Sequence, residues 1–418
     1  MNIKNDSNCV CIERREINDY KCKQKEMLII NKEEKRKDII NNDEMKKPNK
    51  DKEKDKEKDN DKNKNKDKEK NNVFNDIASL KTFLGNNCKE FNEKFEVLEM
   101  INSGSAGAVY KGKLRKNINS KLIAFKFLFN NNKKEKKEKN DKKSKDKNKS
   151  DCNNHFEISI HGILKCKHIP AIYGYYKIQD SSCIAMEFTQ YGDIENLKKK
   201  ILKRSSLSET IVLYIAGGIL EALYYIHVKN KIIHMDIKQQ NVLIDDYLNI
   251  KLTDFSVSIN YKNKSHINLP MVGTCYYMSP EVLGQKRISA SEASKIDIYS
   301  LGVLLYLLAF YDYPYKLNEV SSKDYGQIAK NIEEQKLEFP EDTGHSKVFL
   351  NFLKNCLNKD IKQRYDIHQA MNDVWFKGYK IILDEKEKIY NASKFLIDLM
   401  VDNLITLNKY LKTQETFL

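Results

Sequence analysis

Two lysine-rich tracts limit how much of this chain can fold. Residues 46–70 contain 12 Lys and 8 acidic residues, and residues 133–149 contain 10 Lys and 4 acidic residues. Neither tract has a sizeable apolar side chain whose burial could offset the entropy lost on ordering, so both are expected to be disordered. The predicted organisation is a disordered extension (1–72), a short helical lead-in (73–94), a folded domain (95–377) with a disordered insertion (131–154), and a helical C-terminal extension (378–418).

The same tracts carry most of the excess positive charge. The formal net charge of the chain is +15 at pH 7, and the two tracts contribute +4 and +6 of it. Aromatic side chains, on which bases stack, are absent from both. Nucleic acid is therefore not the expected partner. Nuclear targeting or weak polyanion binding is the alternative interpretation of the tracts.

Cysteine usage and the N-terminus bear on the compartment. The nine cysteines are scattered and form no C-x-x-C pair, which is typical of reduced thiols in a cytoplasmic protein, with the nucleus as the alternative. Residues 1–15 are polar and do not form a secretory signal, and Asn2 excludes N-myristoylation. No run approaches 18 apolar residues, so no membrane span is expected.

The hydrophobic patterns change along the chain from strand to helix periodicity. A short amphipathic helix is predicted at Val73–Leu84, with Gly85 as its stop. The further elements are the strands Phe95–Ile101, Ala108–Leu114 and Lys121–Phe129 and the helices Glu209–His227 and Ile298–Phe310. This order predicts an α+β fold with a small β-rich lobe followed by a larger helical lobe.

A glycine-containing segment, Ile101–Tyr110, lies between two predicted strands. Gly104 and Gly107 lack Cβ atoms, so backbone N–H groups there could approach phosphate oxygens closely. Taken alone, the segment is also compatible with an ordinary hairpin turn. The apolar strand that follows carries a single lysine, Lys126.

Further along, Ile233–Ile244 places Asp, Lys and Asn in a D-x-K-x-x-N pattern between two apolar runs, and Lys251–Ser256 follows with an Asp-Phe pair. These segments, in this order, resemble the signature set of eukaryotic-type protein kinases. The resemblance covers about residues 95–377. It implies a bilobal kinase fold, ATP and Mg²⁺ as cofactors, and protein substrates.

The resemblance assigns roles to the polar residues of these segments. Asp236 would accept the proton of the substrate hydroxyl, and Lys238 would neutralise charge on the γ-phosphate. Asn241 and Asp254 would hold Mg²⁺, which prefers oxygen ligands. The spacing of Asp236, Lys238 and Asn241 resembles that of Ser/Thr kinases.

Nucleotide contacts are implied in the same way. Lys126 would contact the α- and β-phosphates and pair with Glu157, for which a surface position is the alternative. Residues 185–193 resemble the hinge between the two lobes of kinases. Backbone groups of Glu187 and of Phe188 or Thr189 would pair with adenine. Asp193 would bond the ribose or a basic substrate residue. The implied ATP-binding residues are Ile101, Gly104, Gly107, Val109, Lys126, Glu157, Met186, Glu187, Phe188 and Asp193.

A peptide platform is implied after the second motif. Val272–Glu281 resembles the peptide-docking end of the kinase activation segment, and Asp297–Gly302 the buried helix that supports the catalytic loop. Thr274 is expected to bridge Asp236 and Lys238. Glu281 is expected to form a buried ion pair with Arg364.

Three positions depart from the family pattern. Asn102 replaces the first loop glycine, Ser256 replaces the glycine after Asp254-Phe255, and Met235 replaces the arginine that usually precedes the catalytic aspartate. That arginine normally pairs with a phosphorylated activation loop. We therefore expect activity without phosphorylation at Ser265. The departures also support an alternative, a pseudokinase that serves as a scaffold.

Residues 378–418 lie beyond the resemblance. Their apolar residues recur at roughly helical spacing. The segment is expected either to pack back onto the larger lobe or to bind a partner or a second copy through a C-terminal helix.

Overall fold

The computed structural model describes residues 77–104, 107–116, 121–128, 157–178, 181–201, 206–316, 321, 324–341 and 344–392. These residues form two compact units. The first contains the described residues up to 128 together with Tyr173–Ala185, and the second contains the described residues of 157–172 and those from Met186 onward. The predictions for 1–72, for 131–154 and for the last part of the C-terminal extension lie outside the described residues.

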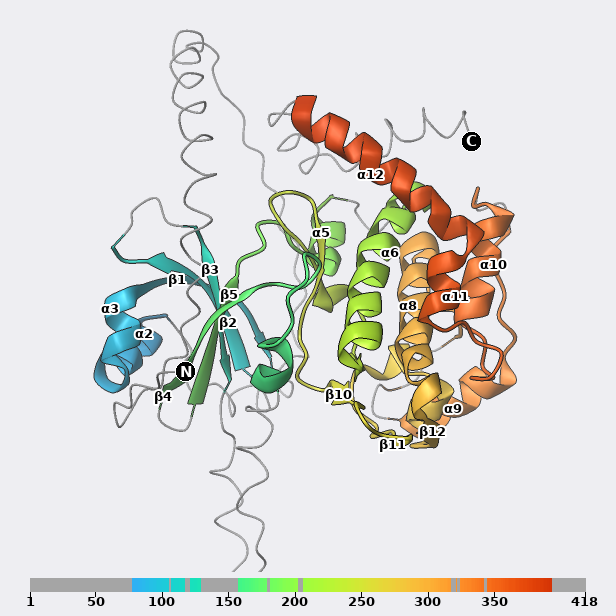
Figure 1. Cartoon of the computed structure of the whole chain (residues 1–418), viewed down its shortest axis with the longest axis horizontal. Coiled ribbons are helices and arrows are strands. Elements are labelled where there is room, and N and C mark those ends of the chain that lie inside the picture. Colours follow the sequence, from blue (N-terminus) through green and yellow to red (C-terminus); the bar gives the residue numbers. More distant parts are fainter. Residues whose placement is uncertain are drawn as a thin grey trace, which may run out of the picture. The chain divides into compact units, whose positions relative to one another are not determined.

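The first unit is built on a five-stranded sheet (Figure 1). The strands are β1 (Phe95–Gly104), β2 (Gly107–Leu114), β3 (Ile123–Leu128), β4 (Ile172–Ile178) and β5 (Ser181–Glu187), in the order β1-β2-β3-β5-β4. Pairing is antiparallel between β1 and β2 and between β2 and β3. The three predicted strands are confirmed, although β1 extends three residues further than expected.

Two helices, α2 (Ile77–Asn87) and α3 (Lys89–Lys94), pack beside this sheet (Figure 1). The fully buried Leu80 and Phe91 join the apolar side chains of β1 and β3 in one cluster. The predicted stop at Gly85 is wrong, because the helix continues to Asn87. A glycine costs a helix only about 1 kcal/mol relative to alanine, and the burial of Leu80 and Leu84 in the turns before it outweighs that cost.

The second unit is mainly helical, so the predicted α+β class, a β-rich part followed by a larger helical part, is confirmed. Its helices are α5 (Ile194–Ile201), α6 (Glu209–Tyr224), α7 (Pro280–Leu283), α8 (Ser294–Phe310), α9 (Tyr325–Glu334), α10 (Lys347–Cys356), α11 (Ile367–Asn372) and α12 (Val374–Ala392). A π-helical turn, Tyr225–Asn230, continues α6. Both predicted helices are present.

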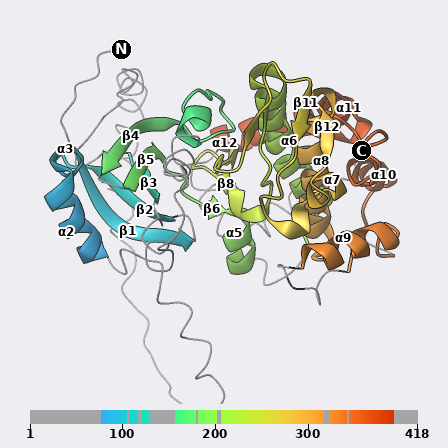
Figure 2. The same cartoon turned by 90° about the horizontal axis from the view of Figure 1, so that it is seen from below.

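Short strands join the helices of this unit, several of them visible in Figure 2. They are β6 (Gly192–Asp193), β7 (Ile232–Ile233), β8 (Val242–Ile244), β9 (Ile250–Leu252), β10 (Ile259–Asn260), β11 (His266–Asn268) and β12 (Arg287–Ser289). They pair as β6-β8-β9, β10-β7 and β11-β12. None has more than three residues, so their positions depend on the helices around them.

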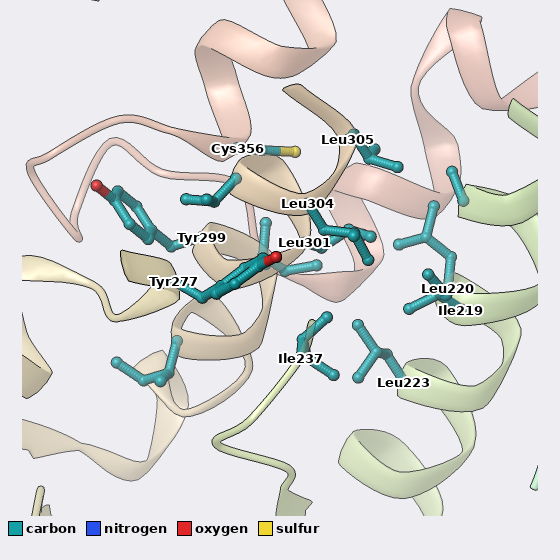
Figure 3. Close-up of a cluster of buried hydrophobic side chains, with 14 of the residues drawn as sticks. Ile219, Leu220, Leu223, Ile237, Tyr277, Tyr299, Leu301, Leu304, Leu305 and Cys356 are labelled. Carbon is teal, nitrogen blue, oxygen red and sulfur yellow. The ribbon is translucent and has the colours of Figure 1, made fainter. Parts of the chain in front are cut away.

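Helices α6 and α8 form the centre of the larger core. Figure 3 shows Leu223 of α6 next to Ile237 of the loop between β7 and β8, and Leu304 of α8 and Cys356 of α10 further along the same cluster. Two segments, Glu209–Asn230 and Ala290–Phe310, are long and apolar enough to cross a membrane, a feature that counting consecutive apolar residues did not reveal. Because 72% and 83% of them are buried inside the protein, they have the character of core helices.

The first half of α12 packs against α6. Tyr379 lies so close to Gly217 that a Cβ atom there would come within 2.2 Å of its ring. Trp375, the single tryptophan of the chain, stacks near Phe349 and Phe352 of α10. The start of the C-terminal extension therefore packs onto the helical unit, which was one of the two expectations for it. Binding of a partner stays a prediction.

Candidate active site

A buried carboxylate fixes the loop between β7 and β8. Asp297 of α8 accepts hydrogen bonds from the backbone N–H groups of His234 (2.7 Å) and Met235 (2.9 Å) and from Nε2 of His227 (2.8 Å). Burial alone raises the pKa of Asp297, but these hydrogen bonds outweigh it and the net pKa lies below its usual value. An ionised side chain on a rigid helix therefore holds the loop, as predicted for Asp297–Gly302.

Three predicted residues converge around the carboxylate of Asp236. Its Oδ1 accepts a hydrogen bond from Thr274 Oγ1 (2.7 Å), and its Oδ2 lies 2.7 Å from Lys238 Nζ and 3.0 Å from Asn241 Nδ2. Lys238 also donates to Thr274 Oγ1 (2.8 Å), so the expected threonine bridge is present. These donors hold the carboxylate of Asp236 in one orientation, as alignment of a substrate hydroxyl requires.

Strand pairing brings the two predicted magnesium ligands together. Val242 of β8 pairs with Leu252 of β9, and the N–H of Thr253 donates to the carbonyl of Asn241 (3.0 Å). Asn241 therefore lies beside Thr253, one residue before Asp254. The amide nitrogen of Asn241 donates to Asp236, which leaves Oδ1 of Asn241 as its atom for a cation.

This donor set fits Mg²⁺. A carboxylate and an amide oxygen are hard ligands, and Mg²⁺ is usually bound by one or two such protein groups plus phosphate oxygens and water. No group of three or more His, Cys, Asp or Glu side chains in the described part of the chain could hold a metal. The remaining ligands would therefore come from a nucleotide and from water.

Aromatic stacking fixes the residue after Asp254, which sequence reasoning did not predict. The buried ring of Phe255 lies between His234 (centroids 4.9 Å apart) and His161 (5.0 Å). His234 accepts the Asp236 N–H at Nδ1 and contacts the Thr253 carbonyl through Nε2, which is the pattern of a neutral imidazole. Burial lowers the pKa of His234 and favours that neutral form. The catalytic loop and the Asp254 segment are thus one packed assembly.

A second feature that the sequence did not reveal is a buried lysine near the predicted hinge. Lys251 Nζ lies 3.0 Å from Glu187 Oε2, 3.0 Å from the carbonyl of Lys167 and 3.6 Å from Asp245 Oδ2. Its three oxygen neighbours explain how an ammonium group can be buried here. The ion pair ties Glu187 to β9, the strand that leads to Asp254.

The hinge backbone has a defined hydrogen-bond pattern. The N–H of Glu187 donates to the carbonyl of Ala171 (2.8 Å), and Glu187 Oε2 accepts from the N–H of Ala171 (3.1 Å). An adenine contact from Glu187 would therefore use its carbonyl oxygen. Met186 is buried, as expected of a side chain behind the nucleotide base, but its role and that of Phe188 stay predictions.

The remaining predicted nucleotide contacts of the first unit lie on its first three strands. Gly104 pairs with Gly107 at the end of the β1–β2 hairpin, and Val109 lies opposite Lys126. Ile101 is half exposed, at a register shift in β1. A Cβ atom at Gly107 would come within 1.9 Å of the Phe127 carbonyl. Glycine is therefore needed there for strand pairing, independently of any contact with a nucleotide phosphate.

Two predicted interactions are not demonstrated by the geometry. Lys126 belongs to the first unit and Glu157, which is buried, to the second, and their pairing stays a prediction. Asp193 accepts hydrogen bonds from the backbone N–H (2.8 Å) and from Nδ2 (2.7 Å) of Asn196. It therefore caps the start of α5. Its contact with ribose or substrate also stays a prediction.

The expected ion pair beneath the peptide platform is present. Arg364 is fully buried and donates to both carboxylate oxygens of Glu281, at 3.1 and 2.9 Å. It also donates to the carbonyls of Asn358 (2.8 Å) and Lys295 (3.2 Å), and its guanidinium lies over the ring of Tyr299. The start of α7 is thereby fixed to the segment before α11.

The hydrogen-bonded group formed by Asp236, Lys238, Asn241 and Thr274 lies on this α+β framework as the sequence motifs predict. The family model described as "Protein kinase domain" matches residues 95–376, and the chain belongs to this family.

Curated relatives carry kinase names. The chain is 28% identical over 289 residues to the dual specificity mitogen-activated protein kinase kinase jkk-1 of Caenorhabditis elegans, covering 68% of this chain and 62% of that protein. It is 32% identical over 291 residues to the serine/threonine-protein kinase dst2 of Dictyostelium discoideum, covering 69% and 23%. It is 29% identical over 299 residues to mouse dual specificity mitogen-activated protein kinase kinase 7, covering 69% and 50%. The chain thus spans less than two thirds of the length of these relatives.

Proposed function

We propose that this protein is a Ser/Thr protein kinase that transfers the γ-phosphate of ATP to hydroxyl groups of other proteins. The observation that carries the proposal is the convergence of Lys238, Asn241 and Thr274 on the buried carboxylate of Asp236. Phosphoryl transfer depends on positioning and charge neutralisation, and this arrangement supplies both.

The residues divide the work of the reaction. Asp236 orients the substrate hydroxyl and takes its proton as the oxygen bonds to the γ-phosphorus and the bond to the β-phosphate oxygen breaks. Lys238 places positive charge beside the transferred group. Asn241 and Asp254 would hold Mg²⁺, which when bound neutralises phosphate charge. Lys126 would orient the α- and β-phosphates.

The test is transfer of radiolabel from ATP to a panel of generic proteins, followed by phosphoamino acid analysis. We expect incorporation that depends on Mg²⁺ and is stopped by a chelator, with label on serine and threonine. The D-x-K-x-x-N spacing supports this specificity, and two of the relatives above are named as dual-specificity enzymes. Label on substrate tyrosine would overturn the Ser/Thr restriction and leave the kinase activity intact.

A pseudokinase scaffold is the second candidate, supported by Asn102 and Ser256, which replace family glycines. Neither substitution removes a side chain that the site uses. Nucleotide binding without any incorporation into the protein panel would favour the scaffold.

We further propose that activity does not require a phosphate on the activation segment. Met235 is buried in the hydrophobic core, so its position offers no cation to a loop phosphate. The segment has other supports, because β10 pairs with β7, and the N–H of Ala290 donates to the carbonyl of Ser265 (2.9 Å). These backbone interactions would order the segment without phosphorylation.

The Ser265→Ala variant tests this independence. The variant and phosphatase-treated native protein should both retain activity within a few-fold of untreated enzyme, because position 235 has no cation that could bind a phosphate. A tenfold or greater loss in the variant, equivalent to about 1.4 kcal/mol of barrier, would contradict the proposal.

A further inference from the structure

A group of basic side chains lies on the outer side of the β11–β12 ladder and in the loop before it. We call this group the basic face. All of its members are exposed. They are Lys262, Lys264, His266, Lys286 and Arg287.

Strand pairing places two members of the basic face, His266 and Arg287, on one side of the ladder, while Lys286 directly precedes β12 and the other two lysines lie in the loop before β11. In the antiparallel register His266 lies opposite Ser289, Ile267 opposite Ile288, and Asn268 opposite Arg287 (β11 and β12 in Figure 2). Ile267 and Ile288 are buried in the core. Because successive strand residues point to opposite sides, His266 and Arg287 point away from that core together.

The charge of the basic face is not compensated within the protein. None of its four lysine and arginine side chains takes part in an ion pair among the described residues. The two acidic residues nearest to Lys286 and Arg287 in sequence form other contacts. Glu281 is bound by Arg364, and Glu292 accepts the backbone N–H of Ser289. The positive charge is therefore available to a partner.

The basic face lies within reach of the catalytic carboxylate. The N–H of Leu269 donates to the carbonyl of Lys286 (3.0 Å), and Thr274 donates to Asp236. Leu269 and Thr274 are five residues apart, and five extended residues span at most about 17 Å. A peptide whose acceptor hydroxyl lies at Asp236 would cover that distance with about five or six residues.

The catalytic loop gives no competing preference for basic peptides. Glu195 of α5 contacts this loop through a hydrogen bond from Gln240 (2.9 Å) and lies 3.2 Å from Lys199. It therefore already has a cationic partner.

We propose that the basic face binds a carboxylate-rich segment of the protein substrate, within about six residues of the phosphorylated serine or threonine. The inference deepens the proposed function and depends on it for the position of the acceptor. Exposed charge pairs are individually weak, so the preference comes from several cations acting together and is sensitive to salt.

The test compares two peptides with the same acceptor, one flanked by Asp and Glu and the other by Asn and Gln. With the full-length chain, we expect kcat/KM to be about tenfold higher for the acidic peptide at low salt, and the difference to shrink as salt rises. In the double variant Lys286→Glu/Arg287→Glu the preference should disappear, while activity on the neutral peptide stays within about twofold.

The matched control is Lys347→Glu/Lys354→Glu, which reverses two exposed charges on α10 and should leave the preference intact. Fluorescence anisotropy of the labelled acidic peptide measures binding without catalysis.

Equal use of both peptides, or equal binding by native chain and Lys286→Glu/Arg287→Glu, would overturn the inference. So would an RNA oligonucleotide that needs the basic face for binding while the acidic peptide does not bind. Peptide binding that needs the basic face, without phosphorylation of either peptide, would support the inference and count against the proposed function.

Discussion

Replacing Asp254 with alanine should reduce phosphoryl transfer by about a thousandfold or more while leaving the fold intact. The N–H of Thr253 donates to the carbonyl of Asn241, so Asp254 follows directly after this contact and would supply the second protein ligand of the proposed Mg²⁺ site. Asp236, the other carboxylate near Asn241, is held by Lys238 and Thr274 and is not free to replace it. Removing a single group that stabilises charge in a transition state typically costs 10²–10³ in kcat, and loss of a bound metal costs more. The side chain is only partly buried, but Asp254 has a φ of 69°, so alanine should cost about 1 kcal/mol of stability there without unfolding the unit.

The measurement pairs initial rates of radiolabel transfer with calorimetric titration of ATP. In the native chain Mg²⁺ should strengthen nucleotide binding, and in Asp254→Ala this increment should be lost. The control is Glu341→Ala, which removes an exposed carboxylate of the same unit and should leave rates unchanged. If Asp254→Ala retained more than a tenth of native kcat, Asp254 would not be part of the site, and the proposed chemistry would be wrong.

The resemblance to kinases identified the candidate catalytic side chains, and their arrangement is largely local because they are close together along the chain. Asp236, Lys238 and Asn241 lie within six residues, and β8 and β9 form a local hairpin that brings in Asp254. The motif alone therefore determines most of their geometry. Thr274 and the Glu281–Arg364 pair are further away in sequence and were expected only through the resemblance to kinases.

The structural side chains behind the site could not be predicted in the same way. His161 and His234 contact Phe255 from distant parts of the chain, and Lys251 contacts the carbonyl of Lys167, 84 residues away. A lysine in a short strand usually indicates a solvent-exposed position, and nothing near Lys251 in sequence marks it as buried. Gly85 shows the converse, because its local preference to end a helix is overridden by the packing of Leu80 and Leu84.

Replacing Arg364 with methionine should lower the free energy of unfolding of the helical unit by about 3–5 kcal/mol. Methionine fills similar volume, so the main cost is electrostatic: Glu281 would be left buried without its counterion. The carbonyls of Asn358 and Lys295 would also lose a charged donor. Glu281 lies in the first turn of α7, at the end of the segment expected to dock the peptide. Loss of its ion pair should therefore lower activity at temperatures where the fold still persists.

The single tryptophan allows the unfolding of the helical unit alone to be followed. Trp375 is buried against α10, so its fluorescence during urea denaturation reports unfolding of the helical unit. The double variant Glu281→Gln/Arg364→Met should recover part of the loss, because it removes the uncompensated charge. Arg287→Met, at an exposed position without an ion pair, should stay within about 0.5 kcal/mol of native. A loss below about 1 kcal/mol in Arg364→Met would mean that water solvates Glu281 and that the ion pair does not stabilise the platform.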